Sequence, residues 1–417
     1  MKIGERKKGK GERGFLPFSF PLSPVPLLAL ADFIVRSAYQ MGKTPLLPIF
    51  AVALGASDAL LGFIVSVSTL TGMMLKPLVG LLSDRWGRRS WLVIGTCFFA
   101  LTPFIYWFVE TPQQLVVVRI IHGLATAIYG PVTLAYIAGR SKKRLAEKLG
   151  WFGLAKEGGY VVGPLLAGWL LLSLSPQLVF TIIGLLSSLA FIPVLMLPEP
   201  EATAKENLEW CTQLRRALKT SRQSASIWFA GGLEATNYIV LYALKAFLPI
   251  YALSIGINVA VVGTFFALQE GVDMLLRPLS GRLSDRLGYL RSTALGMAGL
   301  SFAVLLAIHA QSSLTLLASA LLIGAAQAVI FPAILALVSF QVDSANLGFS
   351  LGLVGSLSNA GKVIGPVATG FLIARFDYVL SFQVLCIGLF MTALIISISS
   401  LKRSSAPSSS LSQSSGD

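Results

Sequence analysis

Long apolar stretches recur along almost the whole chain, and short polar segments separate them. A helix needs about 20 apolar residues to cross the hydrocarbon core of a bilayer. The runs are continuous rather than alternating, as from Pro176 to Leu197, which favours helices over barrel strands. The pattern therefore predicts an all-α integral membrane protein with twelve transmembrane helices. The stretches lie near residues 25–50, 57–82, 91–109, 113–138, 146–172, 176–197, 226–253, 258–283, 290–309, 313–341, 346–373 and 378–400.

Composition supports the same fold class. Of the 417 residues, 55% are hydrophobic and only 12% are charged, which is more apolar surface than a soluble core can bury. A surface in contact with lipid accommodates the excess. The composition therefore excludes an ordinary soluble domain.

Positive charges in the connections between the apolar stretches lie almost entirely in alternate connections. The net charge of +14 would otherwise suggest nucleic acid, but its uneven distribution indicates membrane topology instead. By the positive-inside rule, both termini face the cytoplasm. We expect the protein in the plasma membrane, which is the inner membrane if the source is a Gram-negative bacterium. The basic segments are 2–13, 85–89, 140–148, 205–222, 282–291 and 402–403, whereas 55–59, 110–114, 173–177, 254–260 and 309–313 contain no Lys or Arg.

An internal repeat divides the chain into two pseudo-symmetric bundles of six helices. Residues 76–89 match 277–291, and a series of glycines over 150–168 matches 352–370 with identical spacing. The basic N-terminal segment shows no cleavage site, so we expect no removable signal peptide. We expect a basic cytoplasmic tail at residues 1–24, an N-terminal bundle at 25–198 and a cytoplasmic linker at 199–225. A C-terminal bundle at 226–400 and a disordered cytoplasmic tail at 401–417 follow.

Signatures of metal, disulfide and nucleotide chemistry are incomplete. The three cysteines and two histidines are too widely spaced to suggest a metal site or a disulfide framework. Gly42-Lys43-Thr44 would end a phosphate-binding loop, but it lies inside an apolar helix and the first glycine of the motif is replaced by Ser37. We expect no metal, no cofactor and no enzymatic activity.

The repeated loop resembles the most specific signature of the major facilitator superfamily, Gly-x-x-x-Asp-Arg-x-Gly-Arg-Arg. The resemblance covers nearly everything from the first span to the last, and it implies two six-helix bundles that act as a membrane transporter. In similar transporters the carboxylate corresponding to Asp84 faces the start of the eleventh helix, here 344–347, and locks the outward-facing state. Asp285 would face 143–146 in the same way. The gate residues are Gly80, Asp84, Arg85, Gly87, Arg88 and Arg89, with Gly281, Asp285, Arg286 and Gly288 in the second copy.

A second motif, in the fifth predicted span, resembles the one found in drug:proton antiporter branches of that superfamily. Small residues allow close helix packing, and Pro164 bends the helix, so the motif could seal or rock the halves. Ordinary glycine-mediated packing is the alternative interpretation. The residues are Gly150, Gly159, Gly163, Pro164 and Gly168.

Ionisable residues inside apolar spans indicate where protons and substrate bind, because each is costly in a membrane without a partner or water. Asp32 and Arg36 lie one turn apart, and Glu234 occupies the position of Asp32 in the second half. Arg119 resembles the buried arginine that the superfamily associates with proton transfer, and its counterpart is Ala320. We predict that Asp32, Arg36, Arg119 and Glu234 couple transport to protons. Purely structural ion pairs are the alternative.

Further charged residues could bind the polar part of a substrate, namely Lys156, Glu157, Glu270 and Asp273. The favoured function is proton-coupled antiport that exports a small amphipathic drug-like compound or metabolite, with sodium as the alternative coupling ion. The second hypothesis is import of a sugar, amino acid or organic acid by symport or facilitated diffusion, and the third is lipid handling. We expect a monomer in the lipid bilayer.

Overall fold

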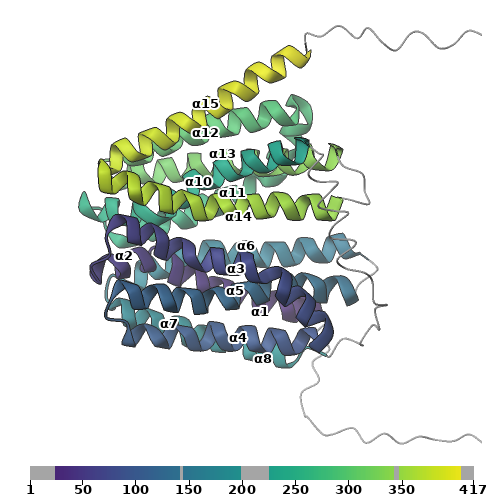
Figure 1. Cartoon of the computed structure of the whole chain (residues 1–417), viewed down its shortest axis with the longest axis vertical. Helices are drawn as coiled ribbons and strands as arrows, with labels where there is room; N and C mark the ends of the chain where they lie inside the picture. The colour runs from purple at the N-terminus through teal and green to yellow at the C-terminus, as the bar shows by residue number, and fades with distance from the viewer. Residues whose placement is uncertain (1–23, 141–143, 199–224, 342–346, 405–417) are drawn as a thin grey trace, which may run out of the picture.

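The computed structural model describes residues 24–140, 144–198, 225–341 and 347–404, and within these ranges all regular elements are helical. The long helices run side by side and roughly parallel (Figure 1). The first half contains α1 (Pro24–Lys43), α2 (Leu46–Ala53), α3 (Asp58–Trp86), α4 (Arg88–Ile105), the 3-10 helix η1 (Tyr106–Phe108), α5 (Pro112–Arg140), α6 (Leu145–Leu170), α7 (Pro176–Ser188) and α8 (Phe191–Leu195). The second half contains α10 (Ala225–Ser254), α11 (Val259–Leu287), α12 (Tyr289–Ile308), α13 (Ser313–Gln341), α14 (Leu347–Arg375) and α15 (Tyr378–Ser404).

Nine helices within the described residues are long and apolar enough to span a membrane. Helices α1, α6 and α14 have 20, 26 and 29 residues but are less apolar, because they carry polar and charged side chains along their length. The all-α membrane fold is confirmed, whereas the count of twelve spans stays a prediction. The predicted N-terminal tail, linker and C-terminal tail lie almost wholly outside the described residues, and α15 continues to Ser404.

Local sequence determines where several helices begin. Ser57 and Ser175 accept hydrogen bonds from the backbone of Leu60 and Leu178, each at 3.4 Å, which caps α3 and α7. Gly87 and Gly288 connect α3 to α4 and α11 to α12, and both have φ of 88°. Side chains other than glycine rarely adopt this conformation. Gly87 therefore allows the chain to reverse between α3 and α4, and Gly288 has the same φ in the repeat.

The two halves meet along two pairs of helices, α3 with α14 and α6 with α11. We call the end that carries Gly87 and Gly288 the motif end, and the other the opposite end. Near the opposite end the backbones approach closely: a Cβ at Gly168 would lie 2.8 Å from the Cα of Gly263. The carbonyl of Pro366 blocks a Cβ at Gly62 in the same way. The halves are thus in direct contact at the opposite end.

The corresponding helix faces are open toward the motif end. A Cβ added at Gly150 or Gly153 of α6, or at Gly352 or Gly355 of α14, would meet no atom within 4 Å among the described residues. The same two helices are therefore packed at one end and uncovered at the other. This geometry gives the molecule a closed end and an open end.

Candidate functional site

Charged residues from both halves gather in the middle of the helices, and Asp32 and Arg36 are part of this cluster. Asp32 is only 1% exposed, and Nη2 of Arg36 donates to its Oδ1 at 3.3 Å. Its second oxygen, Oδ2, has no hydrogen-bond partner among the described residues. Arg36 also lies 5.9 Å from the centre of the Tyr160 ring. The structure thus contains the predicted ion pair, with one carboxylate oxygen left over.

Glu234 lies on α10 and is 4% exposed. The charges of Lys362, Arg277 and Asp273 act on it. Within the described part of the chain Glu234 forms no ion pair, and its Oε2 is buried without a hydrogen-bond partner. The equivalent residue to Arg36 is Tyr238, so the second half lacks the arginine that neutralises Asp32 in the first.

Arg119 is buried on α5 at 1% exposure. It donates to the hydroxyl of Ser68, and its guanidinium lies 6.0 Å from the centre of the Tyr39 ring. The hydroxyl groups of Tyr39 and Ser68 are themselves 3.3 Å apart. His122 stacks edge-to-face on Tyr39, with ring centres 5.1 Å apart. Arg119 therefore belongs to a network of hydroxyl groups and rings.

Three of the four residues predicted to bind substrate form ion pairs between helices or along one helix. Arg277 bonds to Asp273 at 2.6 Å and lies 3.4 Å from Glu157, so it joins α11 to α6 across the two halves. Glu270 accepts from Lys245 at 2.6 Å. Lys156 is half-buried, and its charge acts on Lys76 and Lys362. The four residues thus belong to the same central cluster.

Three further lysines lie at the centre, and none of them is among the site residues predicted from the sequence. Nζ of Lys43, Lys245 and Lys362 lies 4.6, 5.3 and 5.6 Å from the centre of one ring, that of Tyr242. Each lysine interrupts a predicted apolar span, which is the same signal that identified Asp32 and Glu234.

The gate motifs form contacts within their own halves. Asp84 accepts from Nη2 of Arg88 at 2.7 Å, and Nη2 of Arg89 donates to the Leu195 carbonyl at 2.6 Å. Asp285 accepts from the hydroxyl of Tyr289 at 3.1 Å. The predicted partners of Asp84 and Asp285, at 344–347 and 143–146, lie partly outside the described residues. The proposed locking contacts therefore stay predictions.

The glycines of the fifth-span motif serve different contacts. Gly159 and Gly163 pack against Arg36 and Gln40 of α1, within the first half. Gly168 packs against α11 of the second half. Gly150 has no neighbour of this kind among the described residues. Gly168 and the carbonyl of Pro164, which lies against Gly263, are thus the members of the motif that contribute to the contact between the halves.

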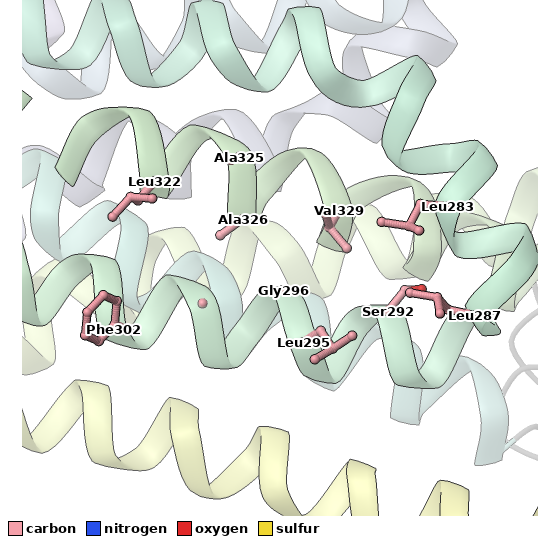
Figure 2. Close-up of a pocket in the computed structure, with 11 residues that line it drawn as sticks. Leu283, Leu287, Ser292, Leu295, Gly296, Phe302, Leu322, Ala325, Ala326 and Val329 are labelled. Atoms are coloured by element: carbon pink, nitrogen blue, oxygen red, sulfur yellow. The ribbon is translucent and has the colours of Figure 1, made fainter. Parts of the chain in front are cut away.

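Two pockets differ in chemistry. A small pocket at the centre has charged and aromatic walls from α1, α6, α10 and α11, namely Gln40, Thr44, Tyr160, Pro164, Lys245, Phe266 and Glu270. A groove of about 280 Å³ lies between α11, α12 and α13, and its lining is almost entirely apolar (Figure 2). Leu295 and Phe302 on its rim are exposed, as suits a surface in contact with hydrocarbon. The central pocket therefore has the chemistry of a candidate binding site, although at about 10 Å³ it has room for no more than a water-sized group in this state.

Comparisons with known proteins agree with this architecture. The family model of the Major Facilitator Superfamily matches residues 28–235 and 227–416. An uncharacterized MFS-type transporter of Methanocaldococcus jannaschii is 30% identical over 336 residues, covering 79% of this chain and 86% of the relative. Multidrug resistance protein 1 of Bacillus subtilis is 24% identical over 364 residues, covering 84% and 90%.

A solved structure shares the fold at low sequence identity. The nucleoside transporter NupG superposes with a TM-score of 0.74 at 16% sequence identity. The superposition covers 93% of this chain and 100% of the NupG chain. With the family match over both halves, the helical fold and the membrane-spanning helices, the chain belongs to the major facilitator superfamily and is a multi-pass membrane transporter, not an enzyme.

Proposed function

We propose that this transporter exports a small amphipathic compound in exchange for protons. The observation that carries the proposal is Glu234, a buried carboxylate whose Oε2 has no hydrogen-bond partner among the described residues and on which the charges of Lys362 and Arg277 act. A carboxylate there can be charged beside a cation or neutral in apolar surroundings, and one proton separates the two forms. The multidrug resistance relative supports export rather than import.

The cycle uses the two ends of the bundle in turn. By the distribution of Lys and Arg, the motif end faces the cytoplasm, so a compound enters the open end from there. The halves then rock about the centre, and the contacts at the opposite end separate. Protons taken up by Asp32 and Glu234 from outside accompany the release of the compound, and their loss to the cytoplasm resets the transporter.

An accumulation assay tests export. The chain is expressed in an efflux-deficient bacterial strain loaded with fluorescent amphipathic dyes of positive, neutral and negative charge. We expect lower steady-state accumulation of at least one dye than in cells with empty vector, and recovery of accumulation when a protonophore is added. Equal accumulation of every dye in both strains, or uptake enhanced by the protein, would contradict export.

A further inference from the structure

Three ammonium groups surround the ring of Tyr242. Lys43 reaches it from α1, Lys245 from α10 and Lys362 from α14, with Nζ at 4.6, 5.3 and 5.6 Å from the ring centre. Tyr238 adds a second ring 4.2 Å from Nζ of Lys362. The electron-rich faces of aromatic rings attract cations, but rings carry no net charge. The rings therefore hold the lysines in place without neutralising them.

Only one of these lysines forms an ion pair within the described residues, although the charge of Glu234 acts on Lys362. Lys245 bonds to Glu270, whereas Lys43 and Lys362 form no ion pair and no hydrogen bond within the described residues. Lys43 is nevertheless only 5% exposed. A buried ammonium group without a partner is costly, and the cost falls when an anion binds beside it.

The repeat explains why Lys43 lacks a partner. Lys43 and Lys245 occupy the same position in the two halves, by the alignment that equates Asp32 with Glu234. Glu270, the partner of Lys245, corresponds to Thr69, if Gly62 is aligned with Gly263. The first half therefore retains the lysine without its carboxylate.

The whole centre has an excess of positive charge. Within the described residues, the cluster holds eight cationic side chains and five carboxylates, and Lys43, Lys76, Arg119, Lys156 and Lys362 form no ion pair. Glu234 is the single carboxylate of the cluster without an ion pair in the same residues. The cations are Arg36, Lys43, Lys76, Arg119, Lys156, Lys245, Arg277 and Lys362, and the carboxylates are Asp32, Glu157, Glu234, Glu270 and Asp273.

From this arrangement we propose that Lys43 and Lys362 bind the anionic group of an amphipathic organic acid, a carboxylate or sulfonate attached to an apolar body. The apolar body packs against Tyr242 and the aromatic wall of the adjoining pocket, which includes Tyr160 and Phe266. A cationic compound is excluded because it meets the net positive charge of the cluster. The proposal rests on the transport activity proposed above, and it depends neither on the direction of transport nor on the coupling ion.

Equilibrium binding to the purified full-length protein tests the charge preference. The probes are 2-naphthoate, the neutral 2-naphthamide and the cationic 2-naphthylmethylammonium, which share one ring system and differ in charge. Isothermal titration calorimetry in detergent should give the tightest binding for naphthoate, by about tenfold or more over the amine. Failure of naphthoate to bind, or equal binding of the amine, would overturn the proposal.

Single substitutions locate the site. Lys43→Gln and Lys362→Gln should each weaken naphthoate binding by about tenfold, because each removes one charge-assisted contact. Lys43→Arg retains the charge and should restore most of the affinity if the variant folds like the wild type. Arg375→Gln, at the exposed end of the same helix as Lys362, removes the same charge and should bind naphthoate like the wild type. Equal affinity in Lys362→Gln and Arg375→Gln would overturn the site.

Proton measurements separate this proposal from the exchange mechanism. In proteoliposomes, labelled naphthoate and internal pH are followed together. Protons that move opposite to naphthoate support both proposals. Protons that move with it, or no proton movement, would contradict antiport and leave the anion site supported. Proton exchange with the amine but none with naphthoate would contradict the anion site alone.

Discussion

Asp32 and Glu234 occupy equivalent positions, yet their neighbours differ. Asp32 is neutralised by Arg36 of its own helix, at 3.3 Å. Because both residues lie one turn apart on α1, movement of one helix against another need not separate them. Glu234 instead depends on the charge of Lys362, which lies on α14. Its electrostatic surroundings therefore change whenever α10 and α14 move relative to each other. This difference makes proton binding at Glu234 more sensitive than proton binding at Asp32 to a movement of helices within the second half.

Neutralising Glu234 should uncouple transport from the pH gradient. We expect Glu234→Gln to retain substrate binding. Its transport rate under an imposed pH gradient should fall by about tenfold or more. Exchange of labelled for unlabelled compound, measured without a gradient, should continue. Glu147→Gln, an exposed carboxylate near the start of α6, is the control and should transport like the wild type. Gradient-driven transport that survives in Glu234→Gln would remove Glu234 from the coupling mechanism.

Individual charged residues were partly predictable from the sequence. Asp32, Arg36, Glu234, Glu270 and Asp273 stand out because a charge interrupts an apolar stretch. Lys43, Lys245 and Lys362 give the same signal, but their convergence on Tyr242 depends on how α1, α10 and α14 pack, which no local pattern specifies. The ion pair of Lys245 could not be predicted from the sequence either, because its partner Glu270 is 25 residues away in the chain.

At the scale of helices, glycine contacts fix how closely the halves approach. Gly168 of α6 and Gly263 of α11 face each other, and a Cβ at Gly263 would lie 2.5 Å from the carbonyl oxygen of Pro164. Gly150 lies in the same helix as Gly168 but at its open end. Sequence spacing identified the glycines of the motif, but it could not say that Gly159 and Gly163 pack within one half while Gly168 packs between the halves.

A methyl group at Gly263 should therefore destabilise the closed contact at the opposite end. Overpacking of this kind costs about 1–3 kcal/mol, so we expect Gly263→Ala to shift the protein toward states with that end open. The measurement is the rate of thiol labelling of Val259→Cys, the first residue of α11, in a cysteine-free background. Labelling should increase by about fivefold or more, which corresponds to about 1 kcal/mol.

Gly150→Ala is the matched control for this experiment. A Cβ added at Gly150 meets no atom within 4 Å among the described residues. Alanine is also a better helix former than glycine, by about 0.5–1 kcal/mol. We expect unchanged labelling of Val259→Cys and equal or higher thermal stability. A similar increase in labelling for both alanine variants would show that the close packing at Gly263 does not hold the opposite end closed.

At the scale of the molecule, the two halves touch at the opposite end and leave helix faces open at the motif end. Tyr378 of α15 adds to the closed end by donating to Asp58 of α3 at 3.0 Å. The sequence predicted the all-α membrane fold and the repeat, since both follow from hydrophobic runs and motif spacing. It could not predict which end is closed, because the same residues must form both states of an alternating-access cycle.

Removing the charge of Asp84 should favour the state described here. In the proposed lock, Asp84 holds the motif end closed through the start of α14, and a neutral side chain is attracted less to a helix N-terminus. Asp84→Asn should therefore increase thiol labelling of Gly355→Cys, on the open face of α14. Asp285→Asn should have a smaller effect, because Tyr289 and Leu290 replace the basic pair of the first motif. Unchanged labelling in Asp84→Asn would exclude the lock.

The central claim is that movement of an amphipathic compound is exchanged for protons through the charged centre. It is tested most directly by proton flux in proteoliposomes that contain the purified protein and a pH-sensitive dye. We predict that vesicles with an acidic interior release protons when a transported compound is added outside, and that empty vesicles do not. Compound uptake that leaves the internal pH unchanged would contradict the claim and indicate a passive carrier.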